Sequence, residues 1–182
     1  KQTYSLWTAI FMAFATLYFL TTWIPKLASA TGLSEELAIY AGTVFNLGAF
    51  FGIVSQGYFS EKFGLSRTIF VYLLLTTVLM ILFGFFGGSI MVLVLFGFIG
   101  FGIQGGFVGM YSIAANIYPT EIRATGVGGA VGIGRVGAIL GPLLGGVLIG
   151  WGFTMAQNFI FFAIPTLIAG IATLFIKLKV KN

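Results

Sequence analysis

The sequence predicts an all-α membrane protein, a single bundle of six membrane-spanning helices over residues 1–182. Only 7% of the residues are charged, whereas a soluble domain carries about 25%, so the chain has too few charges to cover a water-facing surface. Hydrophobic residues make up 59% of the sequence. They gather in six runs, each near the ~20 residues that a helix needs to cross a bilayer.

The first two helices are predicted over about residues 5–25 and 37–59. The first run is longer than the apolar core of a signal peptide and leads into further spans, so we expect a true membrane helix. The stretch Lys26–Glu36 separates it from the second helix, which contains Gly48 and Gly52. Small residues four positions apart form a flat strip against which another membrane helix packs closely.

The other four helices are predicted over about residues 68–86, 90–116, 126–150 and 154–176. Their connections are short, namely Ser60–Arg67, Gly87–Ser89, Tyr118–Thr125 and Trp151–Phe153. Glycines spaced by four recur in the fourth and fifth helices and again predict close packing. These glycines are Gly102 and Gly106, Gly105 and Gly109, Gly128 and Gly132, and Gly137, Gly141 and Gly145.

The basic residues predict the orientation of the bundle. Most of them fall on one side of a six-span arrangement, and only Lys26 falls on the other. The positive-inside rule places the basic side in the cytoplasm, so both chain termini are predicted to be cytoplasmic. The residues on the basic side are Lys1, Lys62, Arg67, Arg123, Lys177, Lys179 and Lys181.

Arg135 lies in the fifth predicted helix, roughly 13 Å below the cytoplasmic edge of a ~30 Å apolar core. Arginine keeps its charge, and a charge at this depth costs at least ~2.5–3.5 kcal/mol, so the guanidinium needs a water-filled cavity or an anion. The chain has four carboxylates, all outside the predicted spans: Glu35, Glu36, Glu61 and Glu121. We therefore expect a substrate carboxylate as the counterion, held by two N–H groups of the guanidinium. The alternative is a structural arginine that bonds backbone carbonyls at a helix break or reaches Glu121.

Three further polar residues are candidates for substrate binding. Gln104 and Tyr111 lie two turns apart on one face of the fourth helix, and Asn46 lies in the second helix. Each of them has a second interpretation, because polar side chains also join membrane helices by hydrogen bonds.

One face of the first predicted helix is aromatic. It is formed by Trp7, Phe11, Phe14 and Tyr18, at spacings of four, three and four. If this face lines a cavity, its rings suit a flat aromatic ligand, and Phe14 and Tyr18 are then candidate substrate contacts. If it does not, the rings pack against lipid or against the interior of the bundle.

Composition also excludes several functions. The sequence has no cysteine, histidine or aspartate, so we expect no metal site, no cofactor and no disulfide. An intramembrane enzyme would need an acid–base or nucleophile–base pair within the spans, and the sequence offers none. The basic residues form no patch, so the net charge of +5 predicts no nucleic-acid partner.

Two connections carry a resemblance to a known family. The stretch from Gly57 to Arg67 resembles the loop motif G-x-x-x-D-R/K-x-G-R-R/K of the major facilitator superfamily. Glu61 stands at the acidic position, Lys62 and Gly64 match, and Arg67 follows three positions after Gly64.

The second connection, Tyr118–Gly126, contains Glu121 and Arg123 and continues into Gly132–Pro142. This stretch resembles the loop and eleventh helix of the aromatic acid:proton symporters, the carriers of 4-hydroxybenzoate and benzoate. The resemblance covers the whole chain but only the second six spans of a twelve-span carrier. Since the chain also starts at Lys1 rather than Met, we expect a piece of a larger protein.

The resemblance implies one half of a major facilitator fold in the inner (plasma) membrane, taking up an aromatic carboxylate together with protons. It implies an N-terminal six-span half as partner, which would hold the proton site. It also implies that the first and fourth helices of this chain line the substrate cavity. The charged residues of the two connections would form ion pairs that hold the inner side closed: Glu61, Lys62, Arg67, Glu121 and Arg123.

Two alternatives stay open. The same fold can carry another organic anion such as nicotinate, a sugar or an organic cation. A six-span chain that stands alone would instead cover its inner face by pairing with a second copy and would not transport by itself.

Overall fold

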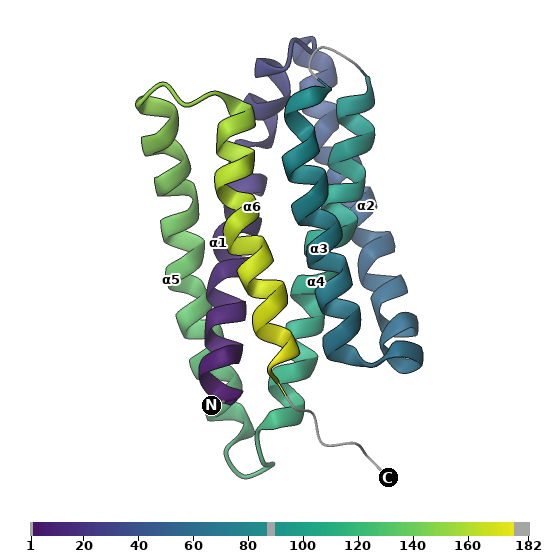
Figure 1. The fold of residues 1–182 in the computed structure, drawn as a ribbon, viewed down its shortest axis with the longest axis vertical. Helices are drawn as coiled ribbons and strands as arrows, with labels where there is room; N and C mark the ends of the chain where they lie inside the picture. Colours follow the sequence, from purple (N-terminus) through teal and green to yellow (C-terminus); the bar gives the residue numbers. More distant parts are fainter. Residues whose placement is uncertain (1, 87–89, 177–182) are drawn as a thin grey trace.

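The computed structural model describes residues 2–86 and 90–176 (Figure 1). In these ranges the chain forms six long helices that run up and down in alternation, with no strand, which confirms the predicted all-α bundle. Each is long and apolar enough to cross a membrane. The helices are α1 (Gln2–Ala30), α2 (Glu35–Phe63), α3 (Leu65–Leu82), α4 (Met91–Ile117), α5 (Arg123–Gly150) and α6 (Met155–Leu174), and a 3-10 turn η1 (Phe83–Phe85) follows α3. The predicted turn Gly87–Ser89 lies outside the described residues, as do Lys1, Lys177, Lys179 and Lys181.

The first connection is shorter than predicted. The expected loop Lys26–Glu36 is wrong, because α1 continues through Pro25 to Ala30 and only residues 31–34 join it to α2. Ser34 begins α2 by accepting a hydrogen bond from the backbone N–H of Leu37. The two glutamates that follow lie in the first helical turn, where the helix dipole favours negative charge.

The connection between α2 and α3 is a single residue, Gly64, so the expected connection Ser60–Arg67 is also wrong. Gly64 has a φ of +88°, which residues with a side chain rarely adopt. Its N–H donates to the carbonyl of Ser60 (3.0 Å), and its carbonyl accepts from the N–H of Thr68 (3.1 Å). One glycine thus ends one helix and begins the next.

Glycines set the closest helix contacts, as the spacing predicted. Helix α2 packs mainly against α4, and α1 against α5. A Cβ atom at Gly48 would overlap the carbonyl of Gly97 on α4, and one at Gly141 would overlap the carbonyl of Ala15 on α1. The pair Gly128 and Gly132 differs, since nothing lies within 4 Å of a Cβ at either position.

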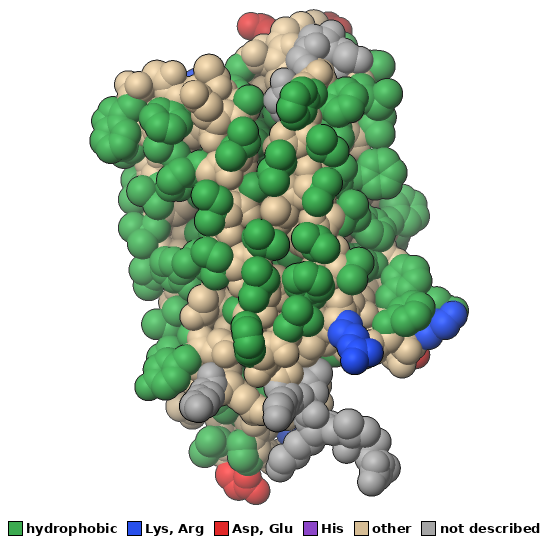
Figure 2. Space-filling model, in the orientation of Figure 1, with side chains coloured by type: hydrophobic (Ala, Val, Ile, Leu, Met, Phe, Trp, Pro, Cys, Tyr) green, Lys and Arg blue, Asp and Glu red, His purple; other side chains and the backbone are tan. Residues whose placement is uncertain are grey.

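The surface of the bundle is largely apolar along its length, as a lipid-facing surface requires (Figure 2). The N-terminal end of α1 and the C-terminal end of α6 lie at one end of the molecule, together with the α2–α3 and α4–α5 connections (Figure 1). We call this the basic end, because Lys62, Arg67 and Arg123 lie in the helical turns next to these connections. Its placement in the cytoplasm stays a prediction.

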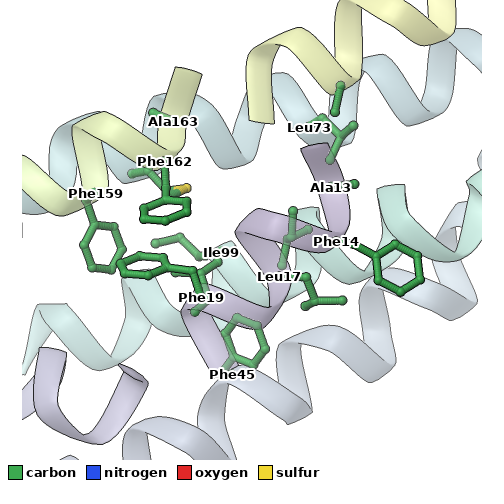
Figure 3. Close-up of a cluster of buried hydrophobic side chains, with 14 of the residues drawn as sticks. Ala13, Phe14, Leu17, Phe19, Phe45, Leu73, Ile99, Phe159, Phe162 and Ala163 are labelled. Carbon is green, nitrogen blue, oxygen red and sulfur yellow. The ribbon is translucent and has the colours of Figure 1, made fainter. Parts of the chain in front are cut away.

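The interior is held by stacked rings between α1, α6 and the α3–α4 region. Phe19 stacks on Phe162 at 3.8 Å between ring centroids, and Phe83 stacks on Phe159 at 3.9 Å. Figure 3 shows Phe14 pointing away from the cluster of Phe19, Phe159 and Phe162. Phe14 instead lines the cavity described next.

Candidate functional site

A cavity of about 330 Å³ lies between α1, α4 and α5, at the middle depth of the bundle. We call it the Arg135 pocket. It contains five of the six residues predicted to bind substrate. Its lining residues are Phe14, Leu17, Tyr18 and Thr21 from α1, Gln104, Phe107 and Tyr111 from α4, and Arg135 from α5.

Arg135 supplies the charge of the pocket. Its Nη1 donates a 3.1 Å hydrogen bond to the hydroxyl of Tyr18, and its guanidinium carbon lies 5.9 Å from the ring centroid of Phe14. Among the described residues it makes no other hydrogen bond, and no carboxylate lies within ion-pair distance. The alternative of bonds to backbone carbonyls or to Glu121 is therefore not what the structure shows.

Most of the guanidinium remains available to a ligand. An arginine carries five N–H donors in a rigid fork, and Tyr18 uses one of them. The side chain is exposed in this chain, so an anion can reach it from the open side of the pocket. The Phe14 ring and the Tyr18 hydroxyl both contact the guanidinium, and its remaining N–H groups are sufficient for bidentate carboxylate binding.

Aromatic rings form the wall beside Arg135. Phe14 stacks on Tyr18 with 5.8 Å between centroids and 4° between ring planes. Phe107 meets Phe14 edge-on at 4.7 Å and Tyr111 edge-on at 5.4 Å. The four rings connect α1 to α4 and offer both faces and edges to a flat ligand.

Two polar groups complete the pocket. The amide of Gln104 and the hydroxyl of Tyr111 make no hydrogen bond to another described residue, and both side chains are half-buried. Gln104 and Tyr111 both line the cavity.

Helical spacing explains why these residues meet, and it also shows what the sequence analysis missed. Gln104, Phe107 and Tyr111 are separated by three and four positions and share one face of α4. Phe107 was not among the predicted residues, although this spacing places it between two that were. Thr21, two turns after Phe14 on α1, carries the same signal.

Gly134 allows α5 to approach this wall. A Cβ atom at Gly134 would overlap the ring of Phe14. Because Gly134 has no side chain, the backbone of α5 lies against the Phe14 ring, directly beside Arg135.

Asn46, which was predicted to bind substrate, does not line the Arg135 pocket. It is exposed on α2, and its amide donates to the carbonyl of Gly42 in the same helix at 2.8 Å. The aromatic face of α1 also divides. Phe11 lines an apolar groove with α5 and α6, whereas Phe14 and Tyr18 face the Arg135 pocket.

The charged residues of the two connections lie away from the pocket, at the basic end. Their side chains are exposed, and no ion pair joins them within the described part of the chain. Ion pairs with another part of the transporter stay a prediction. The residues are Glu61, Lys62, Arg67, Glu121 and Arg123, and Gly57 and Gly64 of the same motif are likewise exposed.

No group of three or more potential metal ligands occurs among residues 2–86 and 90–176. The Arg135 pocket combines one cation, an aromatic wall and two polar groups that make no hydrogen bond to another described residue.

Comparison with known proteins gives the family. The model of the Major Facilitator Superfamily matches residues 6–182. A 4-hydroxybenzoate transporter of Pseudomonas putida is 35% identical over 170 residues, which cover 93% of this chain and 38% of the relative.

Two further relatives are similar over most of the chain. A gentisate transporter of Corynebacterium glutamicum is 30% identical, with 91% of this chain and 39% of the relative covered. A benzoate transport protein of Acinetobacter baylyi is 30% identical, with 96% and 37% covered. The chain thus spans less than two fifths of the length of these relatives. The six-helix bundle and the match over nearly its whole length show that the chain is a multi-pass membrane protein and belongs to the Major Facilitator Superfamily.

Proposed function

We propose that this chain is the C-terminal six-span half of a secondary transporter that takes up an aromatic carboxylate with protons. One observation carries the proposal. Arg135 stands at the middle depth of a membrane bundle with no carboxylate in ion-pair distance among the described residues, beside a wall of four aromatic rings. A substrate carboxylate would supply the missing counterion.

The named relatives support this substrate class. Their printed substrates are 4-hydroxybenzoate, gentisate and benzoate, each a carboxyl group on an aromatic ring. Arg135 argues against an organic cation, and the aromatic wall favours a ring over a sugar. Another aromatic or heteroaromatic acid, such as nicotinate, remains the alternative within the same chemistry. That the relatives are named as transporters agrees with the expectation that the chain is not an enzyme.

In the proposed complex, the substrate carboxylate binds the free N–H groups of Arg135, and the ring lies along Phe14 and Phe107. A ring hydroxyl then reaches Gln104 or Tyr111. The low dielectric of the membrane interior strengthens the ion pair, because little water competes for either charge. The hydroxyl contacts distinguish one aromatic acid from another.

The proposal includes a second six-span half as partner. Arg135 is exposed in this chain, so the open side of the pocket needs a cover before it can enclose a substrate. Self-association of two copies is the alternative cover. The carboxylates of the described chain all lie near helix ends or in a connection, so the proton-binding group belongs to the partner half.

The test is a comparison of 4-hydroxybenzoate with 4-hydroxybenzamide, which lacks the charge, on the full-length carrier. We expect Arg135→Gln to weaken binding of the acid by about 10- to 100-fold, the equivalent of one strong charge-assisted interaction, and to leave the amide nearly unchanged. Arg123→Gln, at the basic end, is the matched control. An equal loss for acid and amide, or no loss for either, would refute a carboxylate at Arg135.

A further inference from the structure

A second cavity lies far from the Arg135 pocket, between α2 and α3 at the basic end. Its volume is about 460 Å³, within the range of roughly 300–1,000 Å³ typical of ligand pockets. We call it the Phe63 groove. Its lining residues are Phe59 and Phe63 from α2 and Arg67, Thr68, Val71 and Tyr72 from α3.

The wall of the groove is apolar although it contains two hydroxyl groups. The Tyr72 hydroxyl is bonded to the Ser55 hydroxyl at 2.8 Å, and the Thr68 hydroxyl donates to the Gly64 carbonyl at 3.0 Å. Both groups are therefore satisfied within the protein. Phe63 and Val71 are 55% and 57% exposed, so large apolar surfaces are open to an outside molecule.

Arg67 is the polar group of this lining that has no partner. Its side chain is exposed and makes no hydrogen bond or ion pair with a described residue. It belongs to the first turns of α3, so it lies at the mouth of the groove toward the basic end. An apolar trough with a free guanidinium at its mouth is complementary to an amphiphile with an anionic head.

The charged residues near the groove also favour an anionic head group. Lys62 is exposed, and its ammonium lies 5.4 Å from the ring centroid of Phe63. A helix with 3.6 residues per turn places Phe59 and Phe63 about 40° apart and Glu61 roughly 160° from Phe63. The carboxylate of Glu61 thus lies on the opposite side of α2 from the Phe63 groove.

We infer that the Phe63 groove binds an anionic glycerophospholipid, with an acyl chain along Phe59, Phe63 and Val71 and the phosphate on Arg67. Lys62 adds a second cation near the head group. Figure 2 shows basic side chains beside hydrophobic ones at the lower right, where α2 and α3 meet. Helix α3 packs against α2, α4 and α6, so the groove is remote from the α1–α5 side that carries Arg135.

The inference does not depend on the substrate of the transporter. It needs only that lipid surrounds the bundle, which membership in this membrane-protein family provides. The basic end is predicted to face the cytoplasm, where anionic lipids give the leaflet a negative surface potential. One basic residue at such a surface changes lipid affinity by about fivefold.

The experiment is native mass spectrometry of the full-length carrier in detergent. Phosphatidylglycerol and phosphatidylcholine with identical acyl chains are compared. We expect preferential retention of phosphatidylglycerol. Arg67→Gln should lower that retention by about fivefold and leave phosphatidylcholine unchanged. Val71→Trp, which fills the groove with an indole, should lower retention of both lipids.

Arg123→Gln is the matched control, since it removes an exposed cation from the other connection at the same end. Circular dichroism confirms that each variant keeps its helical content, and the altered side chains are all exposed in the wild type. Unchanged phosphatidylglycerol retention in both Arg67→Gln and Val71→Trp would overturn the inference. So would an equal loss in Arg123→Gln, because the effect would then be one of net charge.

Discussion

The hydroxyl of Tyr18 on α1 accepts a 3.1 Å hydrogen bond from the guanidinium of Arg135 on α5, across 117 positions of sequence. Tyr18 also stacks on Phe14, whose ring centroid lies 5.9 Å from the guanidinium carbon. Phe14 and Tyr18 of α1 and the charge of α5 therefore line one pocket. We therefore predict that Tyr18 is a positioning residue, which orients the guanidinium of Arg135 toward a carboxylate.

Removal of the Tyr18 hydroxyl tests this positioning. Tyr18→Phe in the full-length carrier should weaken binding of 4-hydroxybenzoate by about 3- to 10-fold, since the aromatic wall stays and one hydrogen bond is lost. In an Arg135→Gln background the same change should have less than about a twofold effect, because the two residues act as a unit. Additive losses in the double variant would show that Tyr18 acts independently of Arg135.

The unpaired groups of α4 predict substrate selectivity. Tyr111→Phe should lower the affinity for 4-hydroxybenzoate by about 2- to 10-fold and leave benzoate nearly unchanged, because only the former has a ring hydroxyl. Gln104→Leu should act in the same direction. The measurement is competition of each acid against a labelled substrate. If both acids lose affinity equally, the hydroxyl of Tyr111 does not read the ring substituent.

The glycine contact between α1 and α5 predicts a difference in stability. Gly141→Val should lower the thermal midpoint in detergent by about 2–12 °C, because any side chain there meets the backbone of Ala15. Gly132→Val is the control, since nothing lies within 4 Å of a Cβ atom at that position on the same helix. Equal midpoints for the two variants would mean that the helices separate without cost.

Gly64 predicts a second stability difference, at the α2–α3 turn. Gly64→Ala should destabilise the bundle by about 1–3 kcal/mol, because alanine must then adopt the positive φ of +88°. Gly57→Ala has open space around it within α2, and alanine favours a helix over glycine by about 0.5–1 kcal/mol. Thermal unfolding should thus move in opposite directions for the two variants. A loss of stability in Gly57→Ala alone would contradict this account.

The six-helix fold was predictable from the sequence because each apolar run extends over the length of a membrane span. Each span repeats its apolar character over many residues, and the glycine spacing marks packing faces such as that of Gly137 and Gly141. The connections were not predictable to the same degree, because they depend on single residues. Gly64 alone replaces the expected connection Ser60–Arg67, and Ser34 allows α2 to begin at Glu35, before the predicted start.

Most of the candidate site was predictable for a related reason. Arg135 is conspicuous as a charge within an apolar run, and helical spacing joins Gln104 to Tyr111 and Phe14 to Tyr18. Asn46 shows the limit of this reasoning. A polar residue in an apolar run has no preferred helix face until its helix is packed, and on α2 it bonds the carbonyl of its own preceding turn.

The backbone contact between α1 and α5 also limits how the site can move. With carbonyl oxygens of α1 seated against Gly137 and Gly141, rotation of α5 about its own axis would drive larger side chains into Phe11 and Ala15. We therefore predict that α1 and α5 move as one body, and that in the proposed transporter Arg135 and Tyr18 move together. Spin labels placed on the outer faces of α1 and α5 should report one unchanged distance with and without substrate, while distances to the partner half change.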